Sequence, residues 1–368
     1  MTWAQYTLEE LLILNYGKSL PENKRSSGEV PVYGSGGIAG FHKEHLVSGP
    51  GIIVGRKGSV GAVFFEKNDF FPIDTVYFVT HNHNETDLRF LYYMLKCLPL
   101  ESLNSDAAVP GLNRNHAYSL KVRIPNYNVQ REIASILSAY DDLIENNNRR
   151  IQLLEESARL LYQEWFVRLR FPGYEHTRIV DGVPEGWEKN TLSELSDVTM
   201  GQSPESKFYN KVGNGLPFHQ GVSDFSERFV SHSTYSTALN RIANAGDILC
   251  SVRAPVGRLN LTVDKIVIGR GLAAIRSKMG HQSFLYYQLK NHFFKEDMIG
   301  GGAIFASVTK KDLLSQVMLT PNGTLMRSFE EFSVPVDMQI QNLFVQNQKL
   351  KAARDLLLPR LMSGEIVV

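Results

Sequence analysis

Apolar residues recur every three or four positions along a stretch near the middle of the chain. Between residues 130 and 168 there is no Gly and no Pro, and the recurring positions are spaced alternately by four and three residues. The members of this series are Ile133, Leu137, Tyr140, Ile144, Asn147, Ile151, Leu154, Ala158, Leu161 and Trp165. Only Asn147 breaks its apolar character. A heptad seam of this length predicts a coiled-coil helix, ~58 Å long at ~1.5 Å per residue.

A second and less regular seam lies 196 residues further along the chain. Its members are Phe329, Ser333, Val336, Ile340, Leu343, Asn347, Leu350, Arg354, Leu357 and Leu361. This stretch also contains Pro335, which has no N–H to donate and whose ring crowds the preceding helical turn. We therefore expect a second long helix with a kink or break at Pro335.

The segments in front of the two seams are also copies of each other. Each copy opens on the same motif, Trp3-x3-Thr7-Leu8-x-Glu10-Leu11 in the first and Trp187-x3-Thr191-Leu192-x-Glu194-Leu195 in the second. The segment Phe90-Leu91-Tyr92-Tyr93 returns as Phe284-Leu285-Tyr286-Tyr287, and the strand-like run at Ile52 returns at Ile248. A fourth match pairs Ile124-Pro125-Asn126 with Thr320-Pro321-Asn322. Four matches in the same order along the chain identify a tandem repeat of a unit about half as long as the chain.

Within each copy, the part before the seam is rich in Gly, aromatic residues and short β-branched runs. These features predict short strands and loops, with one helix at the Phe-Leu-Tyr-Tyr segment. The expected fold class is α+β, with two tandem globular domains separated by two long antiparallel coiled-coil helices and related by a pseudo-twofold repeat. We place the first domain at 1–129, its helix at 130–170, a linker at 171–186, the second domain at 187–323 and its helix at 324–368.

The antiparallel arrangement follows from the length of the connection between the seams. Residues 169–185 could reach only ~60 Å when fully extended, and they contain turn signals of their own. A twofold axis through the centre of the first seam lies near position 149 and brings Asn147 opposite Asn347. We predict that the two amides meet across the seam and penalise slipped registers, in which each amide would face leucine.

The composition of the chain mainly excludes certain classes of protein and site. Lys and Arg number 39 and Asp and Glu 38, so bulk charge points to no partner and a nucleic-acid footprint would have to come from local patches. Two cysteines exclude a disulfide framework and a cysteine-built zinc site. No apolar run approaches ~18 residues, and the chain opens without a charged start and apolar stretch. We expect a cytoplasmic protein that makes no contact with membranes.

A duplicated domain held at a fixed spacing suits a reader of two half-sites on double-stranded DNA. Glycine-framed loops at equivalent positions carry the donor and acceptor side chains that such reading requires. The candidate DNA-binding residues of the first domain are Tyr33, Ser35, Arg56, Lys57, Ser59, Asn113 and Arg114. Those of the second domain are His219, Gln220, Arg253, Arg258, Lys310 and Lys311.

Other motifs in the sequence give weaker indications of a binding or catalytic site. Gly17-Lys18-Ser19 ends like a phosphate loop, but Leu12 stands where the upstream glycine is required. His81-x-His83 lies in a polar loop, where a solvated role is favoured over metal binding. The tyrosine pairs are expected in the core, because both copies share them. Two alternatives to DNA reading stay open: a coiled-coil scaffold that binds proteins alone and, less favoured, an autonomous nuclease or methylase.

These residues resemble the specificity subunit of type I restriction-modification systems. The resemblance rests on the shared opening motif, the linker Phe171-Pro172-Gly173 to Gly182-Val183-Pro184-Glu185-Gly186-Trp187, and the ending Leu358-Pro359-Arg360-Leu361-Met362-Ser363-Gly364-Glu365-Ile366. It implies a non-catalytic subunit without a cofactor of its own, whose two target-recognition domains bind a split DNA target with an unread spacer. It further implies two modification subunits that hold S-adenosylmethionine and methylate adenine, together with restriction-translocase subunits that cut unmodified DNA.

Overall fold

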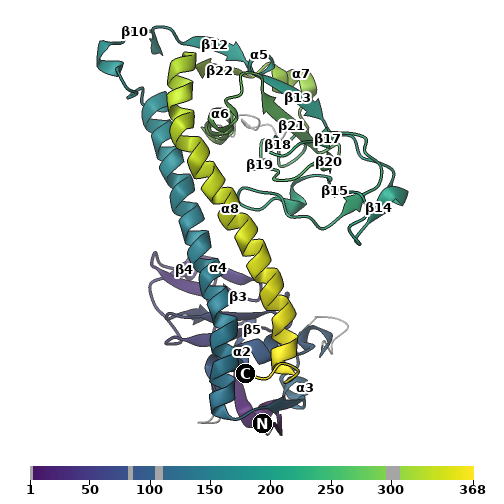
Figure 1. The fold of residues 1–368 in the computed structure, drawn as a ribbon. Coiled ribbons are helices and arrows are strands. Elements are labelled where there is room, and N and C mark those ends of the chain that lie inside the picture. The colour runs from purple at the N-terminus through teal and green to yellow at the C-terminus, as the bar shows by residue number, and fades with distance from the viewer. Residues whose placement is uncertain (1–2, 82–85, 104–110, 296–306) are drawn as a thin grey trace. The chain divides into compact units, whose positions relative to one another are not determined.

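A computed structural model describes residues 3–81, 86–103, 111–295 and 307–368 (Figure 1). The chain divides into two compact units, one formed by Met1–Asn147 with Gln346–Val368 and the other by Asn148–Val345. Each unit combines one globular part, which we call a head, with one segment of each of two long helices. Head one comprises residues 3–124 and head two residues 187–320.

Head one is built on small sheets in which neighbouring strands run antiparallel, except for the parallel pair β3 and β7. A four-stranded sheet has the order β2-β8-β5-β6 and a three-stranded sheet the order β4-β3-β7, while β1 pairs with β9. The strands are β1 (Ala4–Thr7), β2 (Leu12–Tyr16), β3 (Val30–Gly34), β4 (Gly37–His42), β5 (Gly51–Gly55), β6 (Val63–Glu66), β7 (Phe71–Pro72), β8 (Val76–His81) and β9 (Lys121–Ile124). The helices are α1 (Leu8–Leu11), α2 (Leu88–Cys97) and α3 (Arg114–Tyr118).

Head two repeats this plan. The sheet β13-β21-β18-β19 corresponds to β2-β8-β5-β6, and β12 pairs with β22 as β1 does with β9. A five-stranded sheet, β14-β16-β15-β20-β17, is larger than its counterpart. The strands are β12 (Glu188–Thr191), β13 (Ser196–Met200), β14 (Tyr209–Asn210), β15 (Leu216–His219), β16 (Tyr235–Ser236), β17 (Ile242–Ala243), β18 (Ile248–Ser251), β19 (Leu259–Leu261), β20 (Ile266–Ile268), β21 (Leu272–Ser277) and β22 (Val317–Thr320). The helices are α5 (Leu192–Leu195), α6 (Gln282–Lys295) and α7 (Lys310–Leu314). The linker forms a short hairpin, β10 (Ile179–Val180) with β11 (Val183–Pro184).

The opening motif of each copy is the start of a short helix. The carboxylate of Glu10 accepts a hydrogen bond from the backbone N–H of Thr7 at 2.5 Å, and Glu194 does the same for Thr191 at 2.6 Å. Such a capping box satisfies donors that the first helical turn leaves without partners. The two leucines of each motif, Leu8 and Leu11 in the first copy and Leu192 and Leu195 in the second, are then buried in the core.

Both predicted long helices are present. Helix α4 spans Tyr127–Tyr162 and continues as a π-helical turn, Gln163–Val167, while α8 spans Gly323–Met362. The break expected at Pro335 is wrong, because α8 continues through it. Pro335 is exposed, and so is Glu331, whose carbonyl loses its helical donor. Water can therefore hydrate that carbonyl on the solvent side of the helix.

The two helices run antiparallel within each unit. In the first unit, Asn147 donates from Nδ2 to Oδ1 of Asn347 at 3.0 Å, and both side chains are buried. The predicted meeting of the two asparagines is thus confirmed. In the second unit, Ile151 of α4 packs in one cluster with Ile340 and Leu343 of α8. The adjacent seam positions, Ile144 and Ile151 of α4 and Leu343 and Leu350 of α8, are apolar, so the mutual hydrogen bond of the asparagines favours this register.

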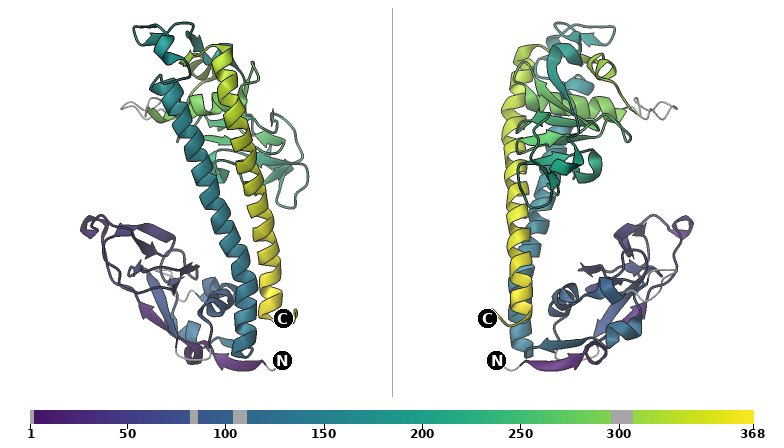
Figure 2. Two further views of the ribbon diagram at one scale, coloured as in Figure 1. Left: turned by 60° about the vertical axis from the view of Figure 1, so that its left-hand side comes forward. Right: turned by 90° about the vertical axis from the view of Figure 1, so that its right-hand side faces the viewer.

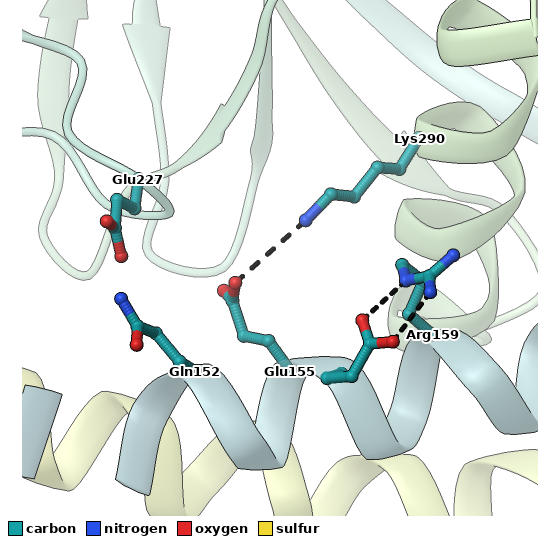
Figure 3. A pocket seen from close by; sticks show the side chains of 6 residues that line it. Gln152, Glu155, Arg159, Glu227 and Lys290 are labelled. Carbon is teal, nitrogen blue, oxygen red and sulfur yellow. Dashed lines mark hydrogen bonds and ion pairs between the residues drawn. The ribbon is translucent and has the colours of Figure 1, made fainter. Parts of the chain in front are cut away.

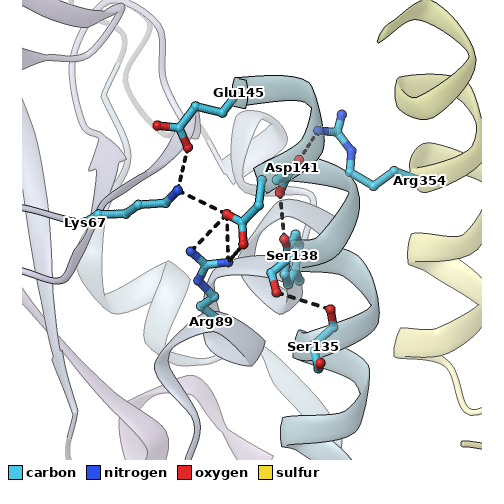
Figure 4. A network of polar contacts seen from close by, with 9 residues as sticks. Lys67, Arg89, Ser135, Ser138, Asp141, Glu145 and Arg354 are labelled. Atoms are coloured by element: carbon cyan, nitrogen blue, oxygen red, sulfur yellow. Dashed lines mark hydrogen bonds and ion pairs between the residues drawn. The ribbon is translucent and has the colours of Figure 1, made fainter. Parts of the chain in front are cut away.

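Each head is attached to the helices through a tyrosine and an aspartate that the two copies share. Tyr93 donates to Asp141 at 2.6 Å in the first unit, and Tyr287 donates to Asp337 at 3.1 Å in the second. The balancing cation differs. Asp141 pairs with Arg354 of α8 (Figure 4), whereas Asp337 pairs with Arg228 from a loop of head two. The expectation that the tyrosine pairs are core residues is confirmed for Tyr93 and for both tyrosines of head two.

The two chain ends lie near each other in the first unit (Figures 1 and 2). Leu357, Leu358 and Leu361, at the end of α8, pack in the core cluster of head one. A Cβ added to Gly364 would stand 3.0 Å from the ring of Trp3, so the final turn packs directly on the opening motif. None of the helices in the described ranges is long and apolar enough to cross a membrane.

Candidate nucleic-acid interface

The three loops singled out in head one meet at one place. The turn between β3 and β4 lies against the loop after β5, since a Cβ on Gly58 would stand 2.9 Å from Oγ of Ser35. Lys57 forms a β-bridge with Gly111, and the N–H of Leu112 donates to the carbonyl of Arg56 at 2.8 Å. The loop after β5 therefore joins the other two, and Ser59 and Lys57 are exposed on it.

A tyrosine between two arginines stands at this junction. The ring of Tyr16, which is 52% exposed, has the guanidinium carbons of Arg56 and Arg114 each 5.3 Å from its centroid. Arg56 is held in addition by two hydrogen bonds to the carbonyl of Asp74. An exposed ring flanked by cations can stack on a base or sugar while the cations face phosphates. Tyr16 was not among the predicted residues, and its place at the end of β2, before Gly17-Lys18, is the only signal in the sequence.

Two predicted residues of head one have internal roles. Tyr33 is 5% exposed and donates to Glu66 at 2.9 Å, so its side chain belongs to the core and not to the surface. Asn113 is exposed, but its Oδ1 accepts the N–H groups of Asn115 and His116 and thereby caps α3. Its amide nitrogen is the group left to face a ligand. Ser35, Arg56, Lys57, Ser59 and Arg114 remain surface candidates.

Head two repeats the same backbone scaffold with different side chains. Arg253 forms a β-bridge with Ser307, as Lys57 does with Gly111, and Val308 donates to the carbonyl of Val252, as Leu112 does to Arg56. Both copies thus use identical loop-to-loop contacts. The side chains on this scaffold differ, because Tyr16 corresponds to Met200 and the half-buried Arg56 to the buried Val252.

The predicted cations of head two are all exposed. Arg253 and Arg258 lie on the loop between β18 and β19, and Lys310 and Lys311 lie in the first turn of α7. The partial positive charge at the N-terminus of a helix disfavours lysines there. The carboxylate of Asp312 offsets this cost and accepts hydrogen bonds from the N–H and the hydroxyl of Thr309, the N-cap residue. Within the described part of the chain, no carboxylate forms an ion pair with these four side chains. Their charges are therefore available to an external anion.

Of the two other predicted residues of head two, Gln220 lies at the surface and His219 in the interior. Gln220 is exposed, and its Oε1 accepts from Ser203 at 2.7 Å. The N–H of the exposed Arg270 donates to the same serine hydroxyl. His219 is wholly buried and contacts Asp224 and His232, so its prediction as a DNA contact is corrected. Ser203 and Arg270 were missed, because only the fold brings their loops together.

A shallow charged pocket of about 370 Å³ lies in the second unit (Figure 3). It is lined by Gln152, Glu155, Glu156, Arg159, Glu227 and Lys290. Most of these charges already have partners, since Arg159 pairs with Glu156, and Glu155 with both Arg228 and Lys290. The pocket is therefore better described as part of the attachment of head two to α4 than as a binding site.

No group of three or more His, Cys, Asp or Glu side chains suited to hold a metal ion occurs among the residues that the structure describes. The pair His81-x-His83 was a weak candidate for such a role. His83 lies outside the described residues.

Comparison with known proteins gives consistent matches over most of the chain. A family model described as the type I restriction modification DNA specificity domain matches residues 1–156 and 184–322. The MjaX specificity subunit of Methanocaldococcus jannaschii, a type I restriction enzyme component by name, is 30% identical over 297 residues, which cover 78% of this chain and 70% of that protein. The MjaIX specificity subunit of the same organism is 25% identical over 302 residues, which cover 76% of this chain and 69% of that one.

The fold also has a counterpart among solved structures. The crystal structure of a type I restriction-modification S subunit from M. genitalium superposes with a TM-score of 0.66 at 19% sequence identity. The superposition covers 98% of this chain and 96% of that chain. The similarity therefore extends to both heads and both long helices.

Proposed function

The chain belongs to the family of type I restriction-modification DNA specificity proteins, and on this premise we propose that each head reads one half of a bipartite DNA target. The observation that carries the proposal is the duplicated loop scaffold. Two copies of the same backbone arrangement present cations at equivalent places, such as Lys57 and Arg253, while the neighbouring side chains differ. Equal scaffolds with unequal side chains are what two half-sites of different sequence require.

Lysines, arginines and the aromatic ring of Tyr16 would contribute to DNA reading in different ways. Lys57, Lys310 and Lys311 are suited to phosphates, which fix register without reading sequence. Arginine can bind the O6 and N7 atoms of guanine in the major groove, a part open to Arg253 and Arg258. In head one, Tyr16 with its flanking arginines supplies a stacking surface at the position that Met200 occupies in head two.

The long helices would set the unread spacer and bind the modification subunits. Exposed apolar residues support the second part. Ile136 and Phe332 occupy equivalent positions of the two copies, as do Leu160 and Leu356, and all four are more than a third exposed. In the antiparallel register Ile136 lies at the level of Leu356 in the first unit, and Leu160 at the level of Phe332 in the second. Two equivalent apolar patches fit two copies of one partner.

Catalysis would then belong to those partners. We propose that S-adenosylmethionine binds in the modification subunits, that restriction-translocase subunits join the same complex, and that this chain is its non-catalytic reader of DNA in the cytoplasm. The target-recognition domains would correspond to 1–129 and 187–323, and the regions 130–170 and 324–368 to the helices that join them.

The target itself can be identified from modified DNA. Methylome sequencing of the host, with and without this reading frame, should reveal a split motif whose methylation disappears on deletion. Electrophoretic shifts with the full chain, alone and assembled with its modification subunits, then test binding to a duplex that carries the motif. A scaffold without DNA readout would leave the methylome unchanged and give no shift.

Charge removal distinguishes the proposed surface from the rest of the chain. Replacing Arg253, Lys310 and Lys311 by glutamine should reduce the slope of log affinity against log salt by ~0.9 for each phosphate that the variant no longer neutralises. The matched control removes the exposed lysines Lys349 and Lys351 of α8 and should leave the slope unchanged. Equal slopes for both variants would contradict the assignment of this surface.

A further inference from the structure

Two histidines of head two are hydrogen-bonded to each other between two aspartates. Nε2 of His219 lies 2.9 Å from Nδ1 of His232, and Nδ1 of His219 lies 2.9 Å from Asp224. At the other end, Nε2 of His232 lies 3.0 Å from Asp264. All four imidazole nitrogens are thus engaged, in a chain that runs from a wholly buried ring to an exposed carboxylate.

Counting protons fixes the charge of this chain. Ionised carboxylates only accept hydrogen bonds, so each aspartate requires an N–H from the histidine that faces it. The contact between the rings requires one further N–H. Two neutral imidazoles carry two N–H groups, whereas the three contacts need three. The arrangement is complete only when the histidine pair holds one additional proton and therefore one positive charge.

The surroundings decide which ring carries that charge. Burial lowers the pKa of His219, against the opposing effect of Asp224, while the charge on His232 acts in the same direction as burial. His219 is then the neutral member, which donates from Nδ1 to Asp224 and accepts at Nε2. His232 then donates from both of its nitrogens, to Nε2 of His219 and to the carboxylate of Asp264.

The pair lies directly beneath the loops that carry the proposed readers of head two. The carbonyl of His219 accepts the N–H of Gly269 at 2.8 Å, and the carbonyl of Gln220 accepts that of Gly271 at 3.2 Å. These bonds tie Gln220 to the turn that bears Arg270. In head one the corresponding carbonyl is that of Tyr33, which accepts the N–H of Ile73 at 2.9 Å. The side chain of Tyr33 is fixed by Glu66, and burial raises the pKa of its hydroxyl, so this anchor does not titrate near neutral pH.

We propose that His219 and His232 are positioning residues that hold the Gln220 and Arg270 loops of head two in their reading arrangement while the pair shares three protons. The inference rests on the proposed function of head two as a reader. The three-proton form is complete at low pH, and as pH rises and the third proton leaves, one of the three contacts has no hydrogen to share. Discrimination by head two should therefore fall as pH rises, and discrimination by head one should not.

Nuclear magnetic resonance of the full chain with ¹⁵N-labelled histidine tests the proton count without DNA. His232 should show two protonated nitrogens at pH 6.5 and His219 only a protonated Nδ1, with assignments from His219→Tyr and His232→Gln spectra. Loss of the second N–H signal of His232 should accompany rising pH. A His232 that is singly protonated throughout pH 6 to 8.5 would overturn the proposal.

The role in reading is tested by binding to duplexes in which one half-site is scrambled. For the assembled complex, the ratio of affinities for intact and scrambled second half-sites should fall about tenfold between pH 6.5 and 8.5. The same ratio for the first half-site is the internal control and should stay constant. Asp264→Asn supplies an amide N–H that a neutral His232 can accept, so it should keep discrimination high at both pH values.

Three results are decisive. An unchanged ratio for the second half-site across this pH range would overturn the proposal. So would a pH profile of Asp264→Asn identical to that of the parent chain. Absence of DNA binding at every pH would instead overturn the proposed function, and the positioning role with it, whatever the histidine spectra show.

Discussion

The asparagine pair between the long helices allows a quantitative test of how the register is set. Asn147 and Asn347 are 1% and 4% exposed, and their amides join at 3.0 Å between apolar neighbours in the seam. Replacing either one by leucine removes this hydrogen bond and leaves the other amide facing a hydrocarbon side chain. Replacing both converts the layer into a leucine pair with the same number and branching of side-chain heavy atoms.

The expected free energies follow from the burial of the two amides. A buried polar group that loses its partner costs ~1–3 kcal/mol, so each single replacement should lower the free energy of unfolding by about this amount. The double replacement removes both polar groups and buries leucine, which is favourable by ~1.5–3 kcal/mol per fully buried side chain. It should be at least as stable as the parent, which implies a coupling energy of about 2 kcal/mol or more.

A local probe is needed because a chain of two units does not unfold in one step. Trp3 is in the first unit, and Trp165 and Trp187 are in the second. In a background with the latter two changed to phenylalanine, fluorescence of Trp3 during urea unfolding reports on the unit that holds the asparagine pair. The control is Asn146→Leu, which alters an exposed neighbour and should change stability by less than ~0.5 kcal/mol.

Additive effects would refute this reasoning. If the double replacement lost the sum of the single losses within ~0.5 kcal/mol, the two amides would not be interacting in the folded chain. A stable double variant has a further consequence, because leucine at both positions no longer penalises a slipped register. DNA cleavage or methylation by its complex should then tolerate altered spacers that the parent rejects.

Four other outcomes are expected. Replacing Lys310 and Lys311 together by glutamine should weaken binding to all duplexes alike and reduce the salt slope by ~1–2 in a titration. Tyr16→Ala should weaken binding by ~1–3 kcal/mol for each base that stacks on the ring, at the first half-site only, in a competition assay. Arg228→Met leaves Glu155 and Asp337 without their buried cation and should destabilise the second unit by ~3–5 kcal/mol in urea unfolding. Burial raises the pKa of Cys250 to about 12, so this thiol should resist alkylation until head two unfolds, a difference that mass spectrometry detects.

Much of the fold could be predicted because its strongest signals are periodic or repeated. The heptad spacing located both helices, and α4 begins at Tyr127, close to the predicted start at 130. Twofold geometry also gave the asparagine contact. The break predicted at Pro335 is absent, because a proline on the solvent side leaves a carbonyl that water can reach. The π-helical turn at Gln163–Val167 has no signal that periodicity could reveal.

The candidate site was harder to predict because neighbours in space come from distant loops. Glycine-rich loops with cations were correctly grouped, since strand order brings their ends together. The sequence did not reveal which side chains of these loops point towards solvent. Tyr33 and His219 stand at the inner ends of their strands, where a polar group is buried with a partner and not presented to a ligand. Tyr16 and Arg270 went unnoticed because neither lies in a distinctive motif.

Comparing the two copies distinguishes the contacts that maintain the fold from the side chains that can read bases. Contacts that are the same in both copies, such as the tyrosine–aspartate bonds to the helices and the bridges at Lys57 and Arg253, hold each head together and carry no information about sequence. Positions that differ on the same backbone and are not buried are free to specify bases: Tyr16 against Met200, and Asp74 against Arg270. If reading depends on these positions, exchanging the set between the heads should change base preference while leaving stability almost unaltered. Each candidate contact in one head can thus be compared with the equivalent position in the other head.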